Sequence, residues 1–225
     1  MMRLKDKVAL VTGAEAGIGL AVAKLFVEEG ATVFASDPAA SNDRSPDVCA
    51  LALDVTSELA WQSAVDRVIE RSGRLDVLVN AAAAASYERL EELSASSWMW
   101  SIALNQTGVF LGMREAVGVM RRQKAGAIVN IAPALNHLPA GEAYACHATT
   151  GAVRSMTRNA ALACMTDNIR INVVLSGVVQ PPMLCGVAPI QVAHGCLFLC
   201  SDEAGGISGA ELAIDGSGPV AAPIS

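Results

Sequence analysis

The stretch Thr12-Gly13-Ala14-Glu15-Ala16-Gly17-Ile18-Gly19 lies between an apolar run, Val8–Val11, and a helical pattern over Ala21–Glu28. A strand, a glycine-rich turn and a helix, in this order, form the geometry that holds the pyrophosphate of a dinucleotide. Gly13 permits a sharp turn, and Gly17 and Gly19 remove side chains where the backbone approaches phosphate or sheet. The N–H groups and dipole of the helix N-terminus favour an anion. An ordinary turn with spare glycines is the alternative interpretation.

Length and composition favour one α/β domain over residues 1–225. The chain has 52% hydrophobic and 17% charged residues, enough apolar material for a large buried core. A net charge of −6 without a basic cluster argues against nucleic acid as a partner. Neither a signal segment nor an apolar run long enough to cross a membrane is evident. We therefore expect a cytoplasmic protein with no membrane partner.

The six cysteines are predicted to be free thiols, because no secretory signal accompanies them. Cys196 and Cys200 are spaced to share a helix face, but no second pair completes a metal site. Buried small hydrophobic side chains are the better interpretation, so no metal is predicted.

A second strand, Ala31–Asp37, ends in a carboxylate at the place where a dinucleotide ribose is held. Asp37 can accept hydrogen bonds from the ribose hydroxyls and would repel a 2′-phosphate, and Glu15 adds to that repulsion. The sequence therefore predicts NAD in preference to NADP. A solvated aspartate at a strand end is the alternative.

The remaining chain alternates between strand and helix patterns, which predicts a doubly wound parallel sheet. Thr56 or Ser57 is expected to cap the first of these helices. Further strands are expected at 48–53, 75–80, 127–132, 170–176 and 210–215, and further helices at 58–71, 94–124, 143–165 and 191–200.

The turn spacing T-G-x-x-x-G-I-G resembles that of the short-chain dehydrogenase/reductase family, and the resemblance covers essentially the whole chain. It implies a Rossmann-like α/β domain with seven mostly parallel strands in the order 3-2-1-4-5-6-7. It also implies nicotinamide-dependent hydride transfer between an alcohol and a carbonyl compound. Family members pair through the two long helices, so we expect a homodimer or homotetramer.

The resemblance assigns a cofactor site residue by residue. The turn supplies Gly13, Ala16, Gly17, Ile18 and Gly19. Asp54 and Val55 would border the adenine, and the segment after strand six would flank the nicotinamide. Where the family has N-N-A-G, this chain has Asn80-Ala81-Ala82-Ala83, which weakens the expected hold on the nicotinamide ribose. The expected cofactor contacts outside the turn are Asp37, Asp54, Val55, Asn80, Ala81, Ala82, Gly177 and Val179.

The family's catalytic residues are mostly replaced in this chain. An ungapped alignment places Pro133 at the serine that holds the substrate oxygen, Cys146 at the acid/base tyrosine and Thr150 at the lysine. The segment that begins at Thr150 matches the one that normally begins with the lysine, which supports this register independently. Of the four usual residues only the asparagine, Asn105, is present. A helical asparagine with a purely structural role is an equal alternative.

Two substitutes for the missing tyrosine can be named. Cys146 carries a thiol at the tyrosine position, and Tyr144 lies two residues earlier, which on a regular helix points to the wrong face. Tyr144 is therefore expected to be a packing residue at the start of the helix. His137 and His147 could titrate near neutral pH, but isolated histidines are more often plain structural residues.

Three hypotheses for function remain open. The leading one is a protein that keeps an NAD site for a small-molecule ligand but has lost ordinary hydride transfer, and that acts by binding or regulation. The second is an active oxidoreductase that uses Tyr144 or Cys146. The third is a non-redox isomerase, cyclase or dehydratase in a remodelled pocket. The fold alone does not choose among them.

Overall fold

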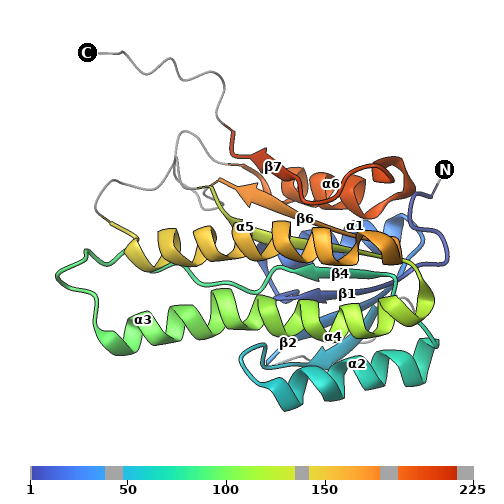
Figure 1. The fold of residues 1–225 in the computed structure, drawn as a ribbon, viewed down its shortest axis with the longest axis horizontal. Coiled ribbons are helices and arrows are strands. Elements are labelled where there is room, and N and C mark those ends of the chain that lie inside the picture. Colours follow the sequence, from blue (N-terminus) through green and yellow to red (C-terminus); the bar gives the residue numbers. More distant parts are fainter. Residues whose placement is uncertain (1, 39–47, 135–141, 178–186, 217–225) are drawn as a thin grey trace.

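The sheet has seven parallel strands in the order β3-β2-β1-β4-β5-β6-β7, as predicted. The computed structural model describes residues 2–38, 48–134, 142–177 and 187–216 of this Rossmann-like α/β domain (Figure 1). Predicted and observed strands agree to within two residues at each end. The strands are β1 Val8–Thr12, β2 Thr32–Asp37, β3 Val48–Ala52, β4 Val77–Asn80, β5 Gly126–Pro133, β6 Ile169–Ser176 and β7 Glu211–Ile214.

The helices follow the predicted pattern with one departure. Ser57 caps α2 by accepting a hydrogen bond from the Ala60 N–H, and Ser94 caps α3 in the same way from Ser97. The single helix expected over 94–124 is continuous but contains a π-helical segment, Ile102–Thr107, between α3 and α4. The bounds are α1 Gly17–Glu28, α2 Glu58–Ser72, α3 Ala95–Ser101, α4 Gly108–Gln123, α5 Tyr144–Cys164 and α6 Pro189–Cys200.

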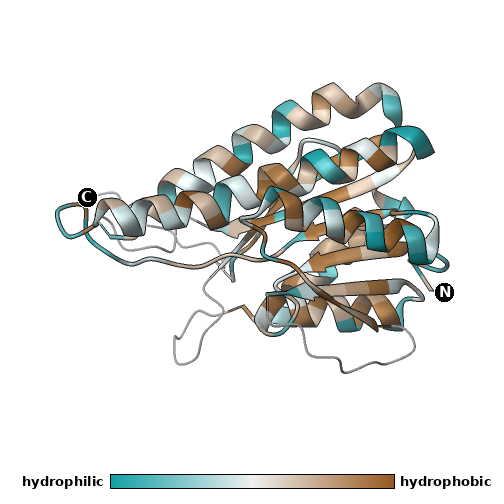
Figure 2. Ribbon diagram, turned by 90° about the horizontal axis from the view of Figure 1, so that it is seen from below, coloured by the Kyte–Doolittle hydropathy of each residue, from teal (hydrophilic) through white to brown (hydrophobic). Residues whose placement is uncertain are grey.

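Helices cover both faces of the sheet, and each face has its own core. In β1, Val8 and Leu10 join the core beneath α2, α4 and α5, whereas Ala9 and Val11 join the core beneath α1 and α6. Successive side chains of a strand point to opposite faces, so a strand buried on both faces must be apolar throughout. This requirement explains the continuous apolar runs that predicted a parallel sheet. Figure 2 shows the strands as largely hydrophobic ribbons.

The described cysteines are free and buried, as predicted. Burial raises the pKa of Cys200 to about 12 and raises the pKa of Cys196 as well, so both thiols stay protonated at neutral pH. Within the described ranges no group of His, Cys, Asp and Glu side chains could hold a metal ion. In the same ranges no helix combines the length and the apolar character that crossing a membrane requires.

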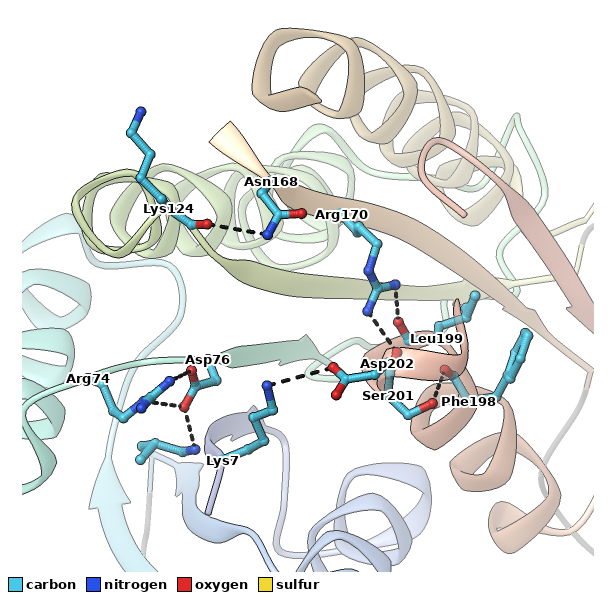
Figure 3. Close-up of polar contacts among 11 residues, drawn as sticks. Lys7, Arg74, Asp76, Lys124, Asn168, Arg170, Phe198, Leu199, Ser201 and Asp202 are labelled. Carbon is cyan, nitrogen blue, oxygen red and sulfur yellow. Dashed lines mark hydrogen bonds and ion pairs between the residues drawn. The ribbon is translucent and has the colours of Figure 1, made fainter. Parts of the chain in front are cut away.

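The amino edge of the sheet is held by polar side chains that bind backbone groups (Figure 3). The buried carboxylate of Asp76 accepts hydrogen bonds from the Val8 N–H at 2.9 Å and from two nitrogens of Arg74 at 2.8 and 2.6 Å. Arg170 donates to the carbonyl groups of Leu199 and Ser201 at the end of α6. These contacts tie the start of β1 to the start of β4 and the start of β6 to the end of α6, and they leave the opposite edge to the site.

The ion pair between α5 and β7 predicts that the stability of the fold decreases at acidic pH. Arg154 donates a hydrogen bond to Glu211 at 3.0 Å, which lowers the pKa of Glu211 below its ordinary 4.5 although burial opposes the shift. Because the folded pKa is depressed, this contribution to stability is present above the unfolded pKa and is lost as pH falls through the folded pKa. Glu211→Gln should therefore lower Tm at neutral pH and lose less Tm on acidification, measured by thermal melts across pH. Exposed Glu70→Gln is the control, and parallel pH profiles for Glu211→Gln and wild type would contradict the assignment.

Candidate functional site

A cavity of about 740 Å³ lies at the carboxyl edge of the sheet. It is lined by the residues at or just after the ends of five strands, including Gly13 after β1, Asp37 at the end of β2 and Ala81 after β4. The chain reverses its winding direction between β1 and β4, and open parallel sheets bind ligands at such a point. The location is therefore that of a nucleotide site.

The glycine turn has the conformation that its spacing predicted. Gly13 has φ +63°, and a Cβ there would lie 2.9 Å from the Cα of Ala82. A Cβ on Gly19 would collide with the carbonyl oxygen of Gly13, so the first turn of α1 packs directly on the loop backbone. Gly17 has φ +56° and faces open space at the cavity. At each of these positions a side chain would disturb either the backbone conformation or a close contact, so glycine is required.

The start of α1 is free to receive an anion. Ala16 is its N-cap and provides no side-chain hydrogen bond, and the first turn contains no acidic residue. Gly17, Ile18 and Gly19 all line the cavity. The N–H groups of a first helical turn have no partner within the helix and point toward such a ligand. A dinucleotide pyrophosphate fits this cradle, and these residues would hold it.

A second feature of the turn is the hydroxyl of Thr12, whose role the sequence did not indicate. The buried Oγ1 atom accepts hydrogen bonds from the N–H groups of Ala81 and Ala82, each at 3.0 Å. Thr12 thereby fixes the loop after β4 beside the loop after β1. Ser36 supports the same turn, since its hydroxyl donates to the Val11 carbonyl and its carbonyl accepts from the Ala14 N–H.

The cavity has one acidic part and one apolar part. Glu15 and Asp37 are the charged side chains that line it among the described residues. The other part is lined by small and apolar side chains: Ala81–Ala85, Leu104, Ile131, Ala132, Pro133, Ala134 and Cys146. Tyr87, Leu104 and Ile131 were not predicted as lining residues, and no local sequence signal distinguishes them from other core positions.

Asn105 and Cys146 both hold the loop that follows β4. The Asn105 side chain donates to the Ala84 carbonyl at 2.8 Å and accepts from the Ala84 N–H at 2.9 Å. The Cys146 sulfur accepts from the Ser86 N–H at 3.4 Å and donates to the Ser86 carbonyl at 3.6 Å. Cys146 also lines the cavity, whereas Asn105 contributes through the loop that it orients.

Tyr144 and Thr150 lie away from the cavity lining. Tyr144 begins α5, is 47% exposed and packs its ring 6.0 Å from that of Trp98. Thr150 is buried, and its hydroxyl has no hydrogen-bond partner within the described part of the chain. Pro133, at the end of β5, lines the cavity directly.

Three of the expected cofactor contacts lie outside the lining. The Asp54 carboxylate accepts hydrogen bonds from Thr56, and the Val55 carbonyl accepts one from the indole of Trp61. Asn80 is buried and donates to the Asn130 carbonyl oxygen Oδ1 at 2.8 Å. Gly177 lines the cavity, and Val179 lies outside the described residues. The contacts of these residues with a nucleotide remain predictions.

Comparison with known proteins agrees with this geometry. A family model described as short chain dehydrogenase matches residues 7–189. The 2,5-dichloro-2,5-cyclohexadiene-1,4-diol dehydrogenase of Sphingobium indicum is 36% identical over 95% of this chain and 96% of its own length. The cyclopentanol dehydrogenase of Comamonas testosteroni is 37% identical over 96% of this chain and 98% of its own length.

A third relative extends the range of these enzymes. The 3-alpha-(or 20-beta)-hydroxysteroid dehydrogenase of Mycobacterium tuberculosis is 35% identical over 95% of this chain and 90% of its own length. The turn, the strand order and these matches agree, and the chain is a member of the short-chain dehydrogenase/reductase family of oxidoreductases.

Proposed function

We propose that the protein binds NAD(H) in the cavity but does not carry out the ordinary hydride transfer of its family. The observation that carries the proposal is that Pro133 and Cys146 line the cavity with apolar surface and that Thr150 is buried outside the lining. The family needs a serine, a tyrosine and a lysine at these positions. Proline offers no hydroxyl to polarise a carbonyl, and threonine offers no charge to lower the pKa of a neighbour.

The preference for NAD over NADP rests on charge. Glu15 and Asp37 line the same cavity as the glycine turn, and a 2′-phosphate beside two carboxylates would be repelled. A bound nicotinamide would supply a hydride acceptor or donor. This chain's own residues would bind the pyrophosphate, orient the ribose through Asp37 and exclude water with the alanine-rich loop held by Asn105.

The second ligand of the cavity is proposed to be a small apolar ring compound. The three relatives are named for a cyclohexadienediol, cyclopentanol and hydroxysteroids, which all contain carbon rings, and the part of the cavity between Ala83 and Cys146 is apolar. Such a protein would act by binding or regulation in the cytoplasm. We also propose a homodimer or homotetramer, because Met99, Phe110, Leu162 and Met165 leave apolar surface exposed on the long helices.

Cofactor titration of wild type and a glycine variant tests the proposal. NADH fluorescence should show saturable binding by wild type and weaker binding of NADPH. With NAD and cyclopentanol or cyclohexanol, no NADH absorbance should appear. Gly19→Ala should weaken NADH binding about tenfold or more, because its Cβ displaces the turn. Gly151→Ala, a helical glycine with no atom near its Cβ, is the matched control and should bind NADH as wild type does.

The opposite outcomes have defined meanings. Turnover by wild type that disappears in Tyr144→Phe or Cys146→Ser would replace the proposal with an active oxidoreductase. Conversion of an added ring alcohol without any nucleotide would replace it with a non-redox enzyme. Equal loss of NADH binding in Gly19→Ala and Gly151→Ala would contradict the assignment of the glycine turn to cofactor binding.

A further inference from the structure

The strand order separates the polar lining of the cavity from its apolar lining. Asp37 ends β2 and the glycine turn follows β1, whereas Pro133 ends β5. Neighbouring strands lie about 4.8 Å apart, and three such spacings, about 14 Å in all, separate β2 from β5. A ligand as long as a dinucleotide would therefore lie with one half over β2 and β1 and the other half over β4, β5 and β6.

The half of the cavity over β2 and β1 offers polar groups to a ligand. Gly17, Ile18 and Gly19 line the cavity at the start of α1, where the N–H groups have no partner within the helix and the N-cap side chain provides none. The carboxylate of Asp37 lies in the same half. A diphosphate is bound by N–H donors and a ribose diol by a carboxylate, so this half suits adenosine diphosphate.

In the other half, two polar side chains are engaged with the loop after β4. Asn105 donates to the Ala84 carbonyl at 2.8 Å and accepts from the Ala84 N–H at 2.9 Å, so both ends of its amide are bonded. The Cys146 thiol is both donor and acceptor toward the backbone of Ser86. These two side chains therefore serve the loop rather than a ligand.

Asn80 and Ser176 are also engaged within the protein. Asn80 is 3% exposed, its amide donates to Asn130 at 2.8 Å, and its carbonyl oxygen lies beside Gly112 of α4. Ser176 lines the cavity, but its hydroxyl donates to the Gly177 carbonyl at 3.0 Å. The wall around them consists mainly of alanine, leucine, isoleucine and proline side chains.

A nicotinamide group gains little from this wall. Its carboxamide would give up water against the alanines and Pro133 without a side-chain partner from the described residues, and this cost offsets the apolar contact of the ring. Tyr87 has a hydroxyl in the lining, but the residue is 52% exposed, so water competes with a ligand for that hydroxyl.

We propose that the cavity selects the adenosine diphosphate half of its ligand and not the nicotinamide half, so that ADP-ribose binds as tightly as NADH. The proposal rests on the nucleotide site proposed above. It widens the ligand class from a redox cofactor to adenosine diphosphates that carry an uncharged group on the second phosphate.

The test compares three probes by calorimetry on the full chain. ADP-ribose has the same diphosphate as NADH but no nicotinamide ring, and nicotinamide mononucleotide has the ring but no adenosine. Wild type should bind ADP-ribose with a Kd within about threefold of that for NADH, and ADP-ribose should displace bound NADH. Nicotinamide mononucleotide should show no saturable binding at concentrations that saturate the site with NADH.

Two variants locate the selection. Asp37→Asn should weaken NADH and ADP-ribose by the same factor, about tenfold, because both carry the adenosine ribose. Asp66→Asn, at an exposed acid on α2 outside the lining, is the matched control and should bind both as wild type does. Tyr87→Phe should also leave both Kd values unchanged, since the proposal assigns no nicotinamide contact to that hydroxyl.

The opposing outcomes separate this inference from the nucleotide site on which it rests. NADH bound tenfold or more tightly than ADP-ribose would overturn the inference and leave the NAD site in place. Saturable binding of nicotinamide mononucleotide, or a Tyr87→Phe variant that weakens NADH alone, would overturn it in the same way. Binding of neither NADH nor ADP-ribose by wild type would contradict both proposals.

Discussion

Trp61→Ala is expected to lower the free energy of unfolding by about 3–5 kcal/mol. Trp61 has no exposed surface and belongs to the core beneath α2, α4 and α5. Its indole donates to the Val55 carbonyl at 3.0 Å, and α4 approaches the ring so closely that a Cβ on Gly112 would lie 2.7 Å from it. Truncation would leave a cavity between two helices and the end of β3. Chemical denaturation measures the loss.

A graded pair of variants shows how the loss of stability scales with the ring volume removed at this position. Trp61→Phe removes the N–H donor and part of the ring, so it should cost clearly less than Trp61→Ala. Trp98→Ala, at a half-buried tryptophan on α3, should cost less than Trp61→Ala as well. A Trp61→Ala variant within about 1 kcal/mol of wild type would show that this core relaxes around the gap.

The second large effect is a gain of activity. The triple variant Pro133→Ser, Cys146→Tyr, Thr150→Lys should oxidise cyclopentanol with NAD about 10²–10⁴-fold faster than a triple variant with Phe in place of Tyr at position 146. Tyrosine and lysine four residues apart share one face of α5, so the ammonium can lower the pKa of the phenol. NADH absorbance measures the rate.

Folding and cofactor binding must be measured on both triple variants, because Thr150 is buried and a lysine there has to keep its charge near the cavity. Thermal melts and NADH titration provide that comparison. If the tyrosine variant folds, binds NADH and is no faster than its phenylalanine counterpart, Pro133, Cys146 and Thr150 do not account for the proposed loss of hydride transfer.

The sequence predicted features that depend on local pattern. The glycines of the turn, the apolar strands and the Ser57 cap each act through neighbouring residues, and all of them appear where expected. The π-helical segment at Ile102–Thr107 was not predicted, because its apolar residues fit an α-helical period equally well. Partners far apart in the chain were also missed, such as the hydrogen bonds from Ala81 and Ala82 to Thr12.

In the candidate site too, features set by local spacing were predicted and contacts between distant residues were not. Its glycine turn and Asp37 were predicted from spacing, and they line the cavity. The contact of Asn80 with the nicotinamide ribose stays a prediction, but the bond that its amide donates to Asn130 on the neighbouring strand was not predicted. Which way a polar side chain turns at the end of a strand depends on a partner 50 residues away, which no local pattern records.

The polar ties at the amino edge, from Asp76 to Val8 and Arg74 and from Arg170 to the end of α6, lie across the sheet from the cavity. The contacts that stabilise the fold and the residues that line the candidate site thus lie at opposite edges of the sheet. Random replacement of the lining side chains outside the glycine turn should yield many variants that still fold, since the polar contacts at the amino edge are left unchanged. The function of such a protein can therefore change through substitutions at the cavity while the fold is kept.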